Sequence, residues 1–191
     1  MTSTILFDDT HDALLAGDVH SAMDGLYEGL ASFRADLPAD QWREFGDLLR
    51  RHPLHHLLLQ SPFARRAFEK PRGYAGDAAL IDFLYGLGQW PRDCSTLGEV
   101  LYSWEFEIPG SRSIRRRRMS IAREIDHVAE DHLAASVLSV ACGHLCEAAL
   151  STAVRESRVH VTGVDQDAES VAMVAADYGI FGVTARVGKG P

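Results

Sequence analysis

The stretch Val137-Leu-Ser-Val-Ala-Cys-Gly-His-Leu-Cys-Glu147 decides how the C-terminal part of the chain folds. Its opening residues are largely apolar, which is typical of a parallel strand that is covered on both faces. A turn that contains Gly143 follows, and the residues after it predict a helix. Further along, Val161-Thr-Gly-Val-Asp-Gln-Asp167 predicts a second apolar strand that ends in a carboxylate. The helix is expected to pack on the sheet through small or apolar side chains: Leu145, Ala148, Ala149, Thr152 and Ala153.

Two residues of this β-α-β unit predict a ligand that contains a ribose. Gly143 lets the backbone of the turn approach a ligand, and Asp165 can accept hydrogen bonds from both ribose hydroxyls. The turn has one glycine instead of the three of a dinucleotide fingerprint, which disfavours a close pyrophosphate contact. The plainer alternative is a β-α-β unit that binds nothing, with Gly143 as an ordinary turn residue.

The residues after Asp165 predict another helix and a third strand. Asp167 is expected to cap the helix, and residues 183–187 alternate like a strand. We therefore expect an α/β fold in two parts: a helical N-terminal region, residues 1–133, and an incomplete Rossmann-like parallel sheet of about three strands, residues 134–191. The inner face of the helix after Asp165 is expected to consist of Val171, Ala172, Ala175 and Ala176.

The N-terminal region shows apolar residues at helical spacing, interrupted by proline and glycine. A break is expected at Gly17-Asp18, and Pro109-Gly110 is expected to precede one long helix that starts at Ser111 or Ser113. The other predicted helices span residues 11–34 on either side of that break, 38–51, 54–60, 62–70, 77–85 and 96–106.

Composition and charge exclude several classes of protein. The chain has 191 residues, 46% of them hydrophobic, and a formal net charge of -8, which argues against a general nucleic-acid binder. No apolar run is long enough to span a membrane, and the acidic N-terminus does not resemble a signal peptide, so we expect a cytoplasmic protein. Cys142 and Cys146 flank His144, but no second ligand pair follows at zinc-site spacing, and no metal is expected.

The segment Phe68-Glu-Lys-Pro-Arg-Gly-Tyr-Ala-Gly-Asp77 cannot continue a helix, because it contains a proline and two glycines. Arg72 could clamp a carboxylate, and Tyr74 could stack on a ligand or donate its hydroxyl. The alternative is a structural connection between two helices.

These segments together resemble a family of class I S-adenosylmethionine-dependent methyltransferases with a helical N-terminal region, which includes 3-hydroxypalmitic acid methyl ester biosynthesis proteins. The resemblance extends from about Arg51 to the end of the chain. It rests on HPLHHLLLQ (52–60), RRAFEKPRGYAGDA (65–78), the arginine-rich helix, VLSVACGHLCEA (137–148) and VDQDAES (164–170).

The resemblance implies that S-adenosyl-L-methionine is the cofactor. Ala141, Gly143 and His144 would line its methionine and ribose side, and Asp165 would hold the ribose hydroxyls. The loop before Asp77 would close over the cofactor, with Arg72 or Tyr74 at its carboxylate or sulfonium end. The implied cofactor-binding residues are Arg72, Tyr74, Gly76, Asp77, Ala141, Gly143, His144, Asp165 and Gln166.

The motif after the first strand departs from the family pattern. Ser139, Ala141 and Leu145 replace an acidic residue and two glycines. We hypothesise that Glu147 takes over the task of the missing acid. No catalytic residue is predicted, although a general base among His52, His55 and His56 is a minor alternative to a packing or surface role.

Two interpretations of function follow from the resemblance. The first is an S-adenosylmethionine-dependent methyltransferase whose acceptor is small or lipid-like, for example the carboxylate of a hydroxy fatty acid. The second is a truncated, non-catalytic cofactor-binding remnant or interaction module, because the family sheet has more strands than are expected here. The first strand would then lie at an open edge, which self-association could cover. A nicotinamide-dependent dehydrogenase fragment is a weaker third interpretation, since it requires a glycine-rich turn.

One motif stays outside these interpretations. Arg115 to Arg118 form a basic block inside the long predicted helix, and four successive residues point around most of a helix. The simpler explanation is a solvated helical turn. The alternative is a patch that binds an anion or a partner.

Overall fold

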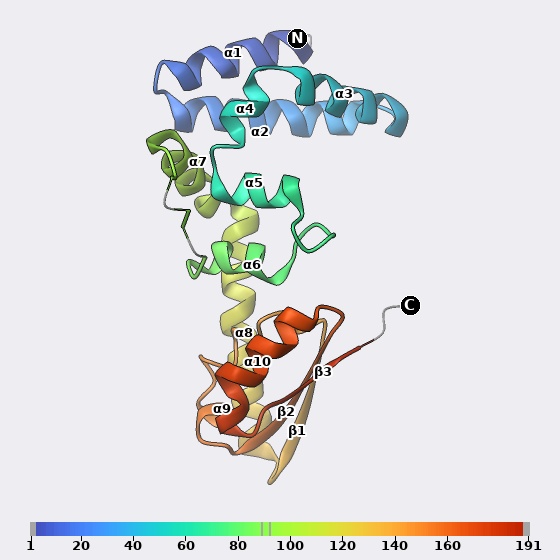
Figure 1. The fold of residues 1–191 in the computed structure, drawn as a ribbon, viewed down its shortest axis with the longest axis vertical. Helices are drawn as coiled ribbons and strands as arrows, with labels where there is room; N and C mark the ends of the chain where they lie inside the picture. Colours follow the sequence, from blue (N-terminus) through green and yellow to red (C-terminus); the bar gives the residue numbers. More distant parts are fainter. Residues whose placement is uncertain (1–2, 89, 92, 189–191) are drawn as a thin grey trace. The chain divides into compact units, whose positions relative to one another are not determined.

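The computed structural model describes residues 3–88, 90–91 and 93–188 (Figure 1). It confirms the predicted α/β class, with a helical N-terminal region and a three-stranded parallel sheet near the C-terminus. Contacts divide the chain into two compact units, Met1–Pro71 with Gln89–Ile108, and Arg72–Gly88 with Pro109–Pro191. The predicted helices up to residue 133 are therefore shared between the two units. In the described part of the chain, no helix is both long and apolar enough to cross a lipid bilayer.

The first unit is helical, and its core contains the fully buried side chains of Phe7, Leu54 and Leu101. Gly17, with a φ of 88°, separates its first two helices as predicted. The hydroxyl of Ser61 caps α5 by accepting a hydrogen bond from the backbone N–H of Ala64. The helices of this unit are α1 (Ser3–Leu15), α2 (Val19–Asp36), α3 (Ala39–Arg51), α4 (Leu54–Leu58), α5 (Pro62–Glu69) and α7 (Thr96–Glu107).

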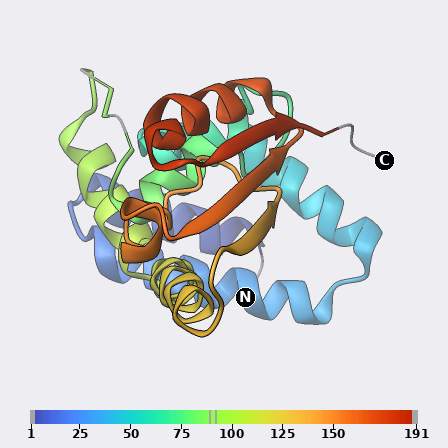
Figure 2. The ribbon, with the colours of Figure 1, turned by 90° about the horizontal axis from the view of Figure 1, so that it is seen from below.

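The second unit contains the sheet. Its strands lie side by side in the order β1-β2-β3, all parallel, with Val137 of β1 opposite Val161 of β2 (Figures 1 and 2). All three strands were expected from the sequence. The elements of this unit are α6 (Ala78–Tyr85), α8 (Pro109–Asp131), β1 (Ala135–Val140), α9 (Thr152–Arg155), β2 (Val159–Asp165), α10 (Ala168–Tyr178), a 3-10 turn (Gly179–Phe181) and β3 (Thr184–Val187).

One face of the sheet is buried and the other is open among the described residues. Val161 packs in a core with Ile125 of α8 and Val174 of α10. On the opposite face, Leu138 is 64% exposed and Val140 is 72% exposed. The prediction that the strands are covered on both faces is therefore wrong for this part of the chain. Parallel crossovers are right-handed, so the connections β1-to-β2 and β2-to-β3 place their helices on the same face.

The helix predicted to begin at Leu145 is also wrong. Residues 141–150 form tight turns, in which the N–H groups of Leu145, Ala148 and Leu150 donate to carbonyls three residues earlier. The helix α9 begins only at Thr152. Leu145 has a left-handed φ of 49°, which ends any helical turn there. The carbonyl of Cys146 accepts hydrogen bonds from Nε and Nη2 of Arg118, at 3.1 and 2.9 Å, instead of from the fourth residue along the chain.

The predicted inner face of α10 is wrong as well. Ser170 and Val174 are its buried residues, whereas Ala172, Ala175 and Ala176 are exposed. Apolar residues surround most of this helix, so periodicity alone could not select the buried face. The polar contacts of its first turn, described next, explain why the Ser170 side faces inward.

Candidate functional site

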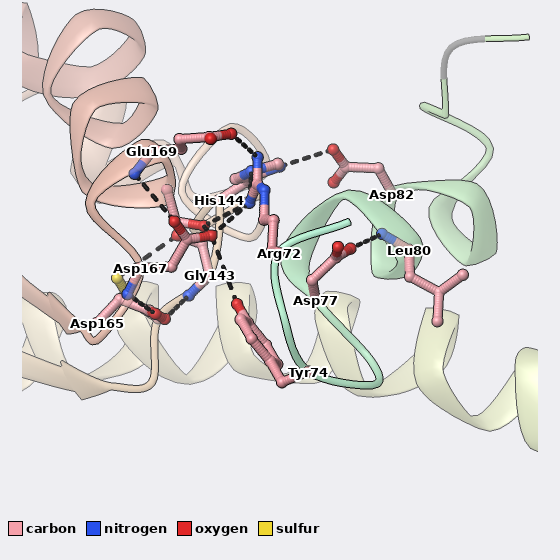
Figure 3. Close-up of polar contacts among 12 residues, drawn as sticks. Arg72, Tyr74, Asp77, Leu80, Asp82, Gly143, His144, Asp165, Asp167 and Glu169 are labelled. Atoms are coloured by element: carbon pink, nitrogen blue, oxygen red, sulfur yellow. Dashed lines mark hydrogen bonds and ion pairs between the residues drawn. The ribbon is translucent and has the colours of Figure 1, made fainter. Parts of the chain in front are cut away.

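The predicted ligand-binding residues gather where β1 and β2 end, next to the segment that leads into α6 (Figure 3). All of them belong to the second unit. Ligands of open parallel sheets bind beyond the carboxyl ends of the strands, and this is the corresponding end of the sheet.

Asp165 fixes the two turns at this edge. The residue is buried, with 8% of its surface exposed. One carboxylate oxygen, Oδ2, accepts the N–H of Gly143 at 2.8 Å, and Oδ1 accepts the N–H of Asp167 at 2.9 Å. An ionised carboxylate offers about four lone-pair sites, so it can still accept hydrogen bonds from a diol.

The backbone of the turn after β1 is held in an unusual conformation. Ala141 and Gly143 both have a φ of 54°, a region that residues with a Cβ adopt rarely. A Cβ added to Gly143 would lie 3.2 Å from the Cβ of Ala78 at the start of α6, so the glycine permits a close approach. Strained backbone of this kind is frequent at functional sites, where the surrounding structure enforces it.

Arg72 ties the segment before α6 to the first turn of α10. Its Nη1 donates to Oδ2 of Asp167 at 2.6 Å and to Oγ of Ser170 at 3.0 Å, and its Nη2 lies 3.2 Å from Oε2 of Glu169 (Figure 3). Burial opposes ionisation of Asp167, but hydrogen bonds from Ser170 and from the N–H of Glu169, together with the charge of Arg72, hold its pKa below the usual value. The cluster is therefore a largely buried ion pair.

Tyr74 points toward the same carboxylate. Its hydroxyl lies 3.4 Å from Oδ2 of Asp167, a long hydrogen bond. Burial, and then the negative charge of Asp167, raise the pKa of Tyr74, so this side chain remains a neutral donor near pH 7.

Asp82 holds His144, and sequence reasoning missed it. Oδ2 of Asp82 lies 2.7 Å from Nδ1 of His144 (Figure 3). Oδ1 of Asp82 accepts a hydrogen bond from the thiol of Cys146 at 3.3 Å. Nη1 of Arg72 lies 3.3 Å from Nε2 of His144. Because a carboxylate accepts hydrogen bonds, Nδ1 of His144 is the donor in its contact with Asp82. No local pattern marks Asp82, since its partners lie more than sixty residues away.

Two adjoining cavities open at this edge. One has a volume of about 440 Å³ and the other about 310 Å³, and both are lined by Ala78, Ile81, Val140, Ala141 and Gly143. The first is completed by Tyr74, Gly76, Val164, Asp165, Gln166 and Gly188. The second is completed by Asp82, Tyr85, Arg117, Ile121, Ser139, Cys142, His144, Leu145, Cys146 and Glu147. Both volumes fall near the range of small-molecule sites.

Glu147 supplies a carboxyl group to the second cavity, which Ser139 also lines. Burial raises the pKa of Glu147, and the charges of Arg118 and Arg117 act in the opposite direction. Glu147, hypothesised to replace an acidic residue, thus lines the same cavity as Ser139, which stands where that acidic residue was expected.

The structure separates the predicted site residues into three groups. Arg72 and Asp77 line neither cavity: Arg72 is engaged with α10, and Oδ1 of Asp77 caps α6 by accepting the N–H of Leu80 at 2.7 Å. His144 lines the second cavity only, whereas Ala141 and Gly143 line both cavities. The remaining four line the first cavity only: Tyr74, Gly76, Asp165 and Gln166.

The histidines considered as general bases belong to the first unit. Nε2 of His52 lies 3.0 Å from the carboxylate of Asp8, and the ring of His55 contacts that of Phe68 at a centroid distance of 4.8 Å. Burial lowers the pKa of His55, followed by the effect of neighbouring His56. These contacts are those of packing residues.

No protein-family model matches the chain, and no curated protein matches it. A solved structure, described as that of a possible exported protein from Bordetella parapertussis, is similar with a TM-score of 0.49 and 17% sequence identity. The match covers 97% of this chain and 54% of that one, so the chain spans about half the length of that protein. Similarity at this level carries no argument about function.

Proposed function

We propose that the second unit binds S-adenosylmethionine and that the chain acts as a methyltransferase. The observation that carries the proposal is the position of Asp165. Its buried carboxylate orients the turn at Gly143 and lines a cavity of about 440 Å³ at the carboxyl ends of the strands. A pre-oriented carboxylate with free lone pairs is what recognition of a ribose diol requires.

The ribose and base of the cofactor would lie in the first cavity, between Asp165 and the segment that carries Tyr74 and Gly76. The methionine end would extend into the second cavity. There Glu147 could receive its ammonium group and Arg117 its carboxylate, since both line that space. Arg72, which with Tyr74 was expected at the carboxylate or sulfonium end, would instead stabilise the site through Asp167.

When bound, S-adenosylmethionine would supply an electrophilic methyl group on its sulfonium centre. The role of the protein would be to hold the acceptor oxygen in line with the methyl group and the sulfur. This alignment accounts for much of the catalysis when the nucleophile is already ionised. A carboxylate acceptor, such as that of a hydroxy fatty acid, needs no strong base. The resemblance to the methyltransferase family supports this choice of acceptor.

Calorimetric titration tests the cofactor. S-adenosylhomocysteine is expected to bind at a single site, and NAD is expected not to bind, because the turn has one glycine. Asp165→Asn should weaken binding at least about tenfold, since it replaces an acceptor of two ribose hydrogen bonds. Asp177→Asn, an exposed position on α10, is the matched control and should bind normally. Binding of NAD in preference, or of neither compound, would reject the cofactor assignment.

Glu147→Gln tests the second cavity independently. The substitution keeps the shape of the side chain and removes its charge, so the affinity for S-adenosylhomocysteine should fall several-fold. Full affinity in this variant would show that Glu147 does not replace the missing acid. The same variant titrated with 5'-methylthioadenosine, which lacks the amino-acid end, should behave like the unmodified protein.

A second candidate function is a cofactor-binding or interaction module without turnover. It is favoured by β1, whose outer side has no neighbouring strand among the described residues and whose Leu138 and Val140 are exposed. Such an edge can pair with another copy of the chain or with a partner. Methyl transfer to a lipid acid would support the enzyme, whereas binding without transfer would support the module. Light scattering on the same sample tests whether the edge mediates self-association.

A further inference from the structure

The four arginines of the basic block, residues 115–118 of α8, lie in different surroundings. Arg116 is exposed and lines no cavity described above, and Arg117 lines the second cavity of the candidate site. Arg115 and Arg118 line a separate cavity of about 470 Å³. They belong to a stripe at helical spacing that continues through Met119, Ala122, Arg123 and Asp126. The cavity is completed by Tyr85 of α6 and Leu150 of the turn region.

The wall of this cavity combines cations with exposed apolar surface. Met119 of α8 is 55% exposed and Leu150 is 43% exposed, and Ala122 of α8 also lines the cavity. Three guanidinium groups face one carboxylate, that of Asp126. The carboxylate of Asp126 accepts hydrogen bonds from Ser151, Thr152 and Ala153 at the start of α9, so it has a structural role there. The lining of the cavity therefore contains more cationic than anionic side chains, in a chain whose net charge is -8.

Arg118 is the fixed cation of the cavity. Its guanidinium donates twice to the carbonyl of Cys146, and it stacks over the ring of Tyr85 at 4.8 Å from the centroid. Both contacts hold the group in place without neutralising its charge, because neither partner is an anion. Nη1 of Arg115 donates to the carbonyl of Leu84 at 3.5 Å, and Arg123 is exposed.

We propose that this cavity is a second binding site, for a small organic anion with an apolar body. The anionic head would lie at Arg115, Arg118 and Arg123. The apolar body would cover Met119, Ala122 and Leu150. Such a ligand complements both properties of the wall, whereas a neutral apolar molecule leaves the guanidinium charges unused and an inorganic anion leaves the apolar surface exposed.

Titration of the full chain with naphthalene-2-sulfonate tests the site. Saturable single-site binding is expected, and it should weaken as salt is added because the head group is recognised by charge. Naphthalene-2-methanol, a neutral molecule of similar shape, and inorganic sulfate should each bind at least about tenfold more weakly. Equal affinity for the neutral compound, or no binding of the sulfonate, would overturn the proposal.

Four variants locate the probe. Arg123→Gln should lower its affinity about tenfold, and Met119→Glu should abolish binding by placing a negative charge on the apolar surface. Arg118→Gln should also lower it, but this change removes contacts to Cys146, so the two exposed positions carry the test. Arg116→Gln is the matched control and should bind normally. Unchanged affinity in the first two variants, or displacement of the probe by S-adenosylhomocysteine, would reject this location.

Discussion

Nη1 of Arg72 lies 2.6 Å from Oδ2 of Asp167, and this pair joins the segment before α6 to the turn after β2. The two side chains are 11% and 9% exposed, so the pair is shielded from water. The same arginine contacts His144, which Asp82 of α6 holds from the other side. Segments far apart in the sequence are thereby connected around the turn that carries Gly143.

Removal of Arg72 is expected to destabilise the second unit strongly. Arg72→Ala leaves the carboxylate of Asp167 buried without its cation, which typically costs about 3 to 5 kcal/mol for a buried pair. Urea denaturation measures the loss. The exposed pair formed by Arg158 and Glu156, 2.8 Å apart, is the control, and Arg158→Ala should cost less than about 1 kcal/mol.

A double-mutant cycle separates the interaction from other effects of Arg72→Ala. Either single change already removes the ion pair, so the double variant should be more stable than the sum of the two single losses predicts. Asp167→Ala also removes the cap of α10, and the cycle subtracts this separate loss. Additive losses would mean that the ion pair contributes nothing and that Arg72 matters only through packing.

A double-mutant cycle should also detect the hydrogen bond between Asp82 and His144. Asp82→Ala leaves both Nδ1 of His144 and the thiol of Cys146 without their acceptor. We expect a coupling free energy between Asp82→Ala and His144→Ala on the order of 1 to 2 kcal/mol, measured by urea denaturation. Glu124→Ala, an exposed position on α8, should show no coupling to His144→Ala. A coupling near zero would mean that the hydrogen bond is absent in solution.

Local sequence patterns predicted the elements of this fold better than the contacts between them. The apolar strands around Val137 and Val161 and the cap at Asp167 were all expected, because each depends on residues close in the chain. The helix expected from Leu145 failed for a distant reason, since the carbonyl of Cys146 bonds Arg118. No periodicity within either segment reveals such a contact.

In the candidate site too, residues marked by local patterns were predicted, and contacts between distant segments were not. Asp165 and Gly143 were expected from strand ends and a turn, and the structure joins them by a hydrogen bond of 2.8 Å. Asp82 was missed because its role depends on pairing across the fold. Arg72 or Tyr74 was expected at the carboxylate or sulfonium end of a cofactor, whereas in the structure the guanidinium of Arg72 bonds Asp167.

The three cysteines should differ in reactivity. Burial raises the pKa of Cys142 to about 11 and that of Cys146 to about 12, and nearby carboxylates act in the same direction. Cys94 is less buried, although burial raises its pKa too. Iodoacetamide at pH 8 should therefore modify Cys94 first, because the thiolate is the reactive form and must be accessible.

Mass spectrometry of the alkylated peptides measures the order of modification. Cys142 and Cys146 should react at the rate of Cys94 only after the chain is unfolded in urea. Cys94→Ser should remove the fast phase without changing the slow ones. Rapid alkylation of Cys146 in the native protein would show that its hydrogen bond to Asp82 is not maintained.

The stability of the first unit should fall between about pH 4.5 and pH 7 because of Glu105. Burial raises the pKa of this carboxyl from 4.5 to about 7, despite an opposing hydrogen bond from Ser61. Below pH 4.5 the group is protonated in both the folded and the unfolded chain. As the pH rises, the unfolded chain loses the proton first, so it binds fewer protons than the folded chain and the free energy of unfolding decreases.

Glu105→Gln should remove this pH dependence and stabilise the protein above pH 7. One pKa unit corresponds to about 1.4 kcal/mol, and partial exposure screens the effect, so the gain should be on the order of 2 kcal/mol. Urea denaturation at pH 5 and pH 8 measures it. Glu99→Gln, an exposed position on the same helix, should retain the slope of the unmodified protein. A Glu105→Gln variant that keeps this slope would assign the pH dependence to other groups.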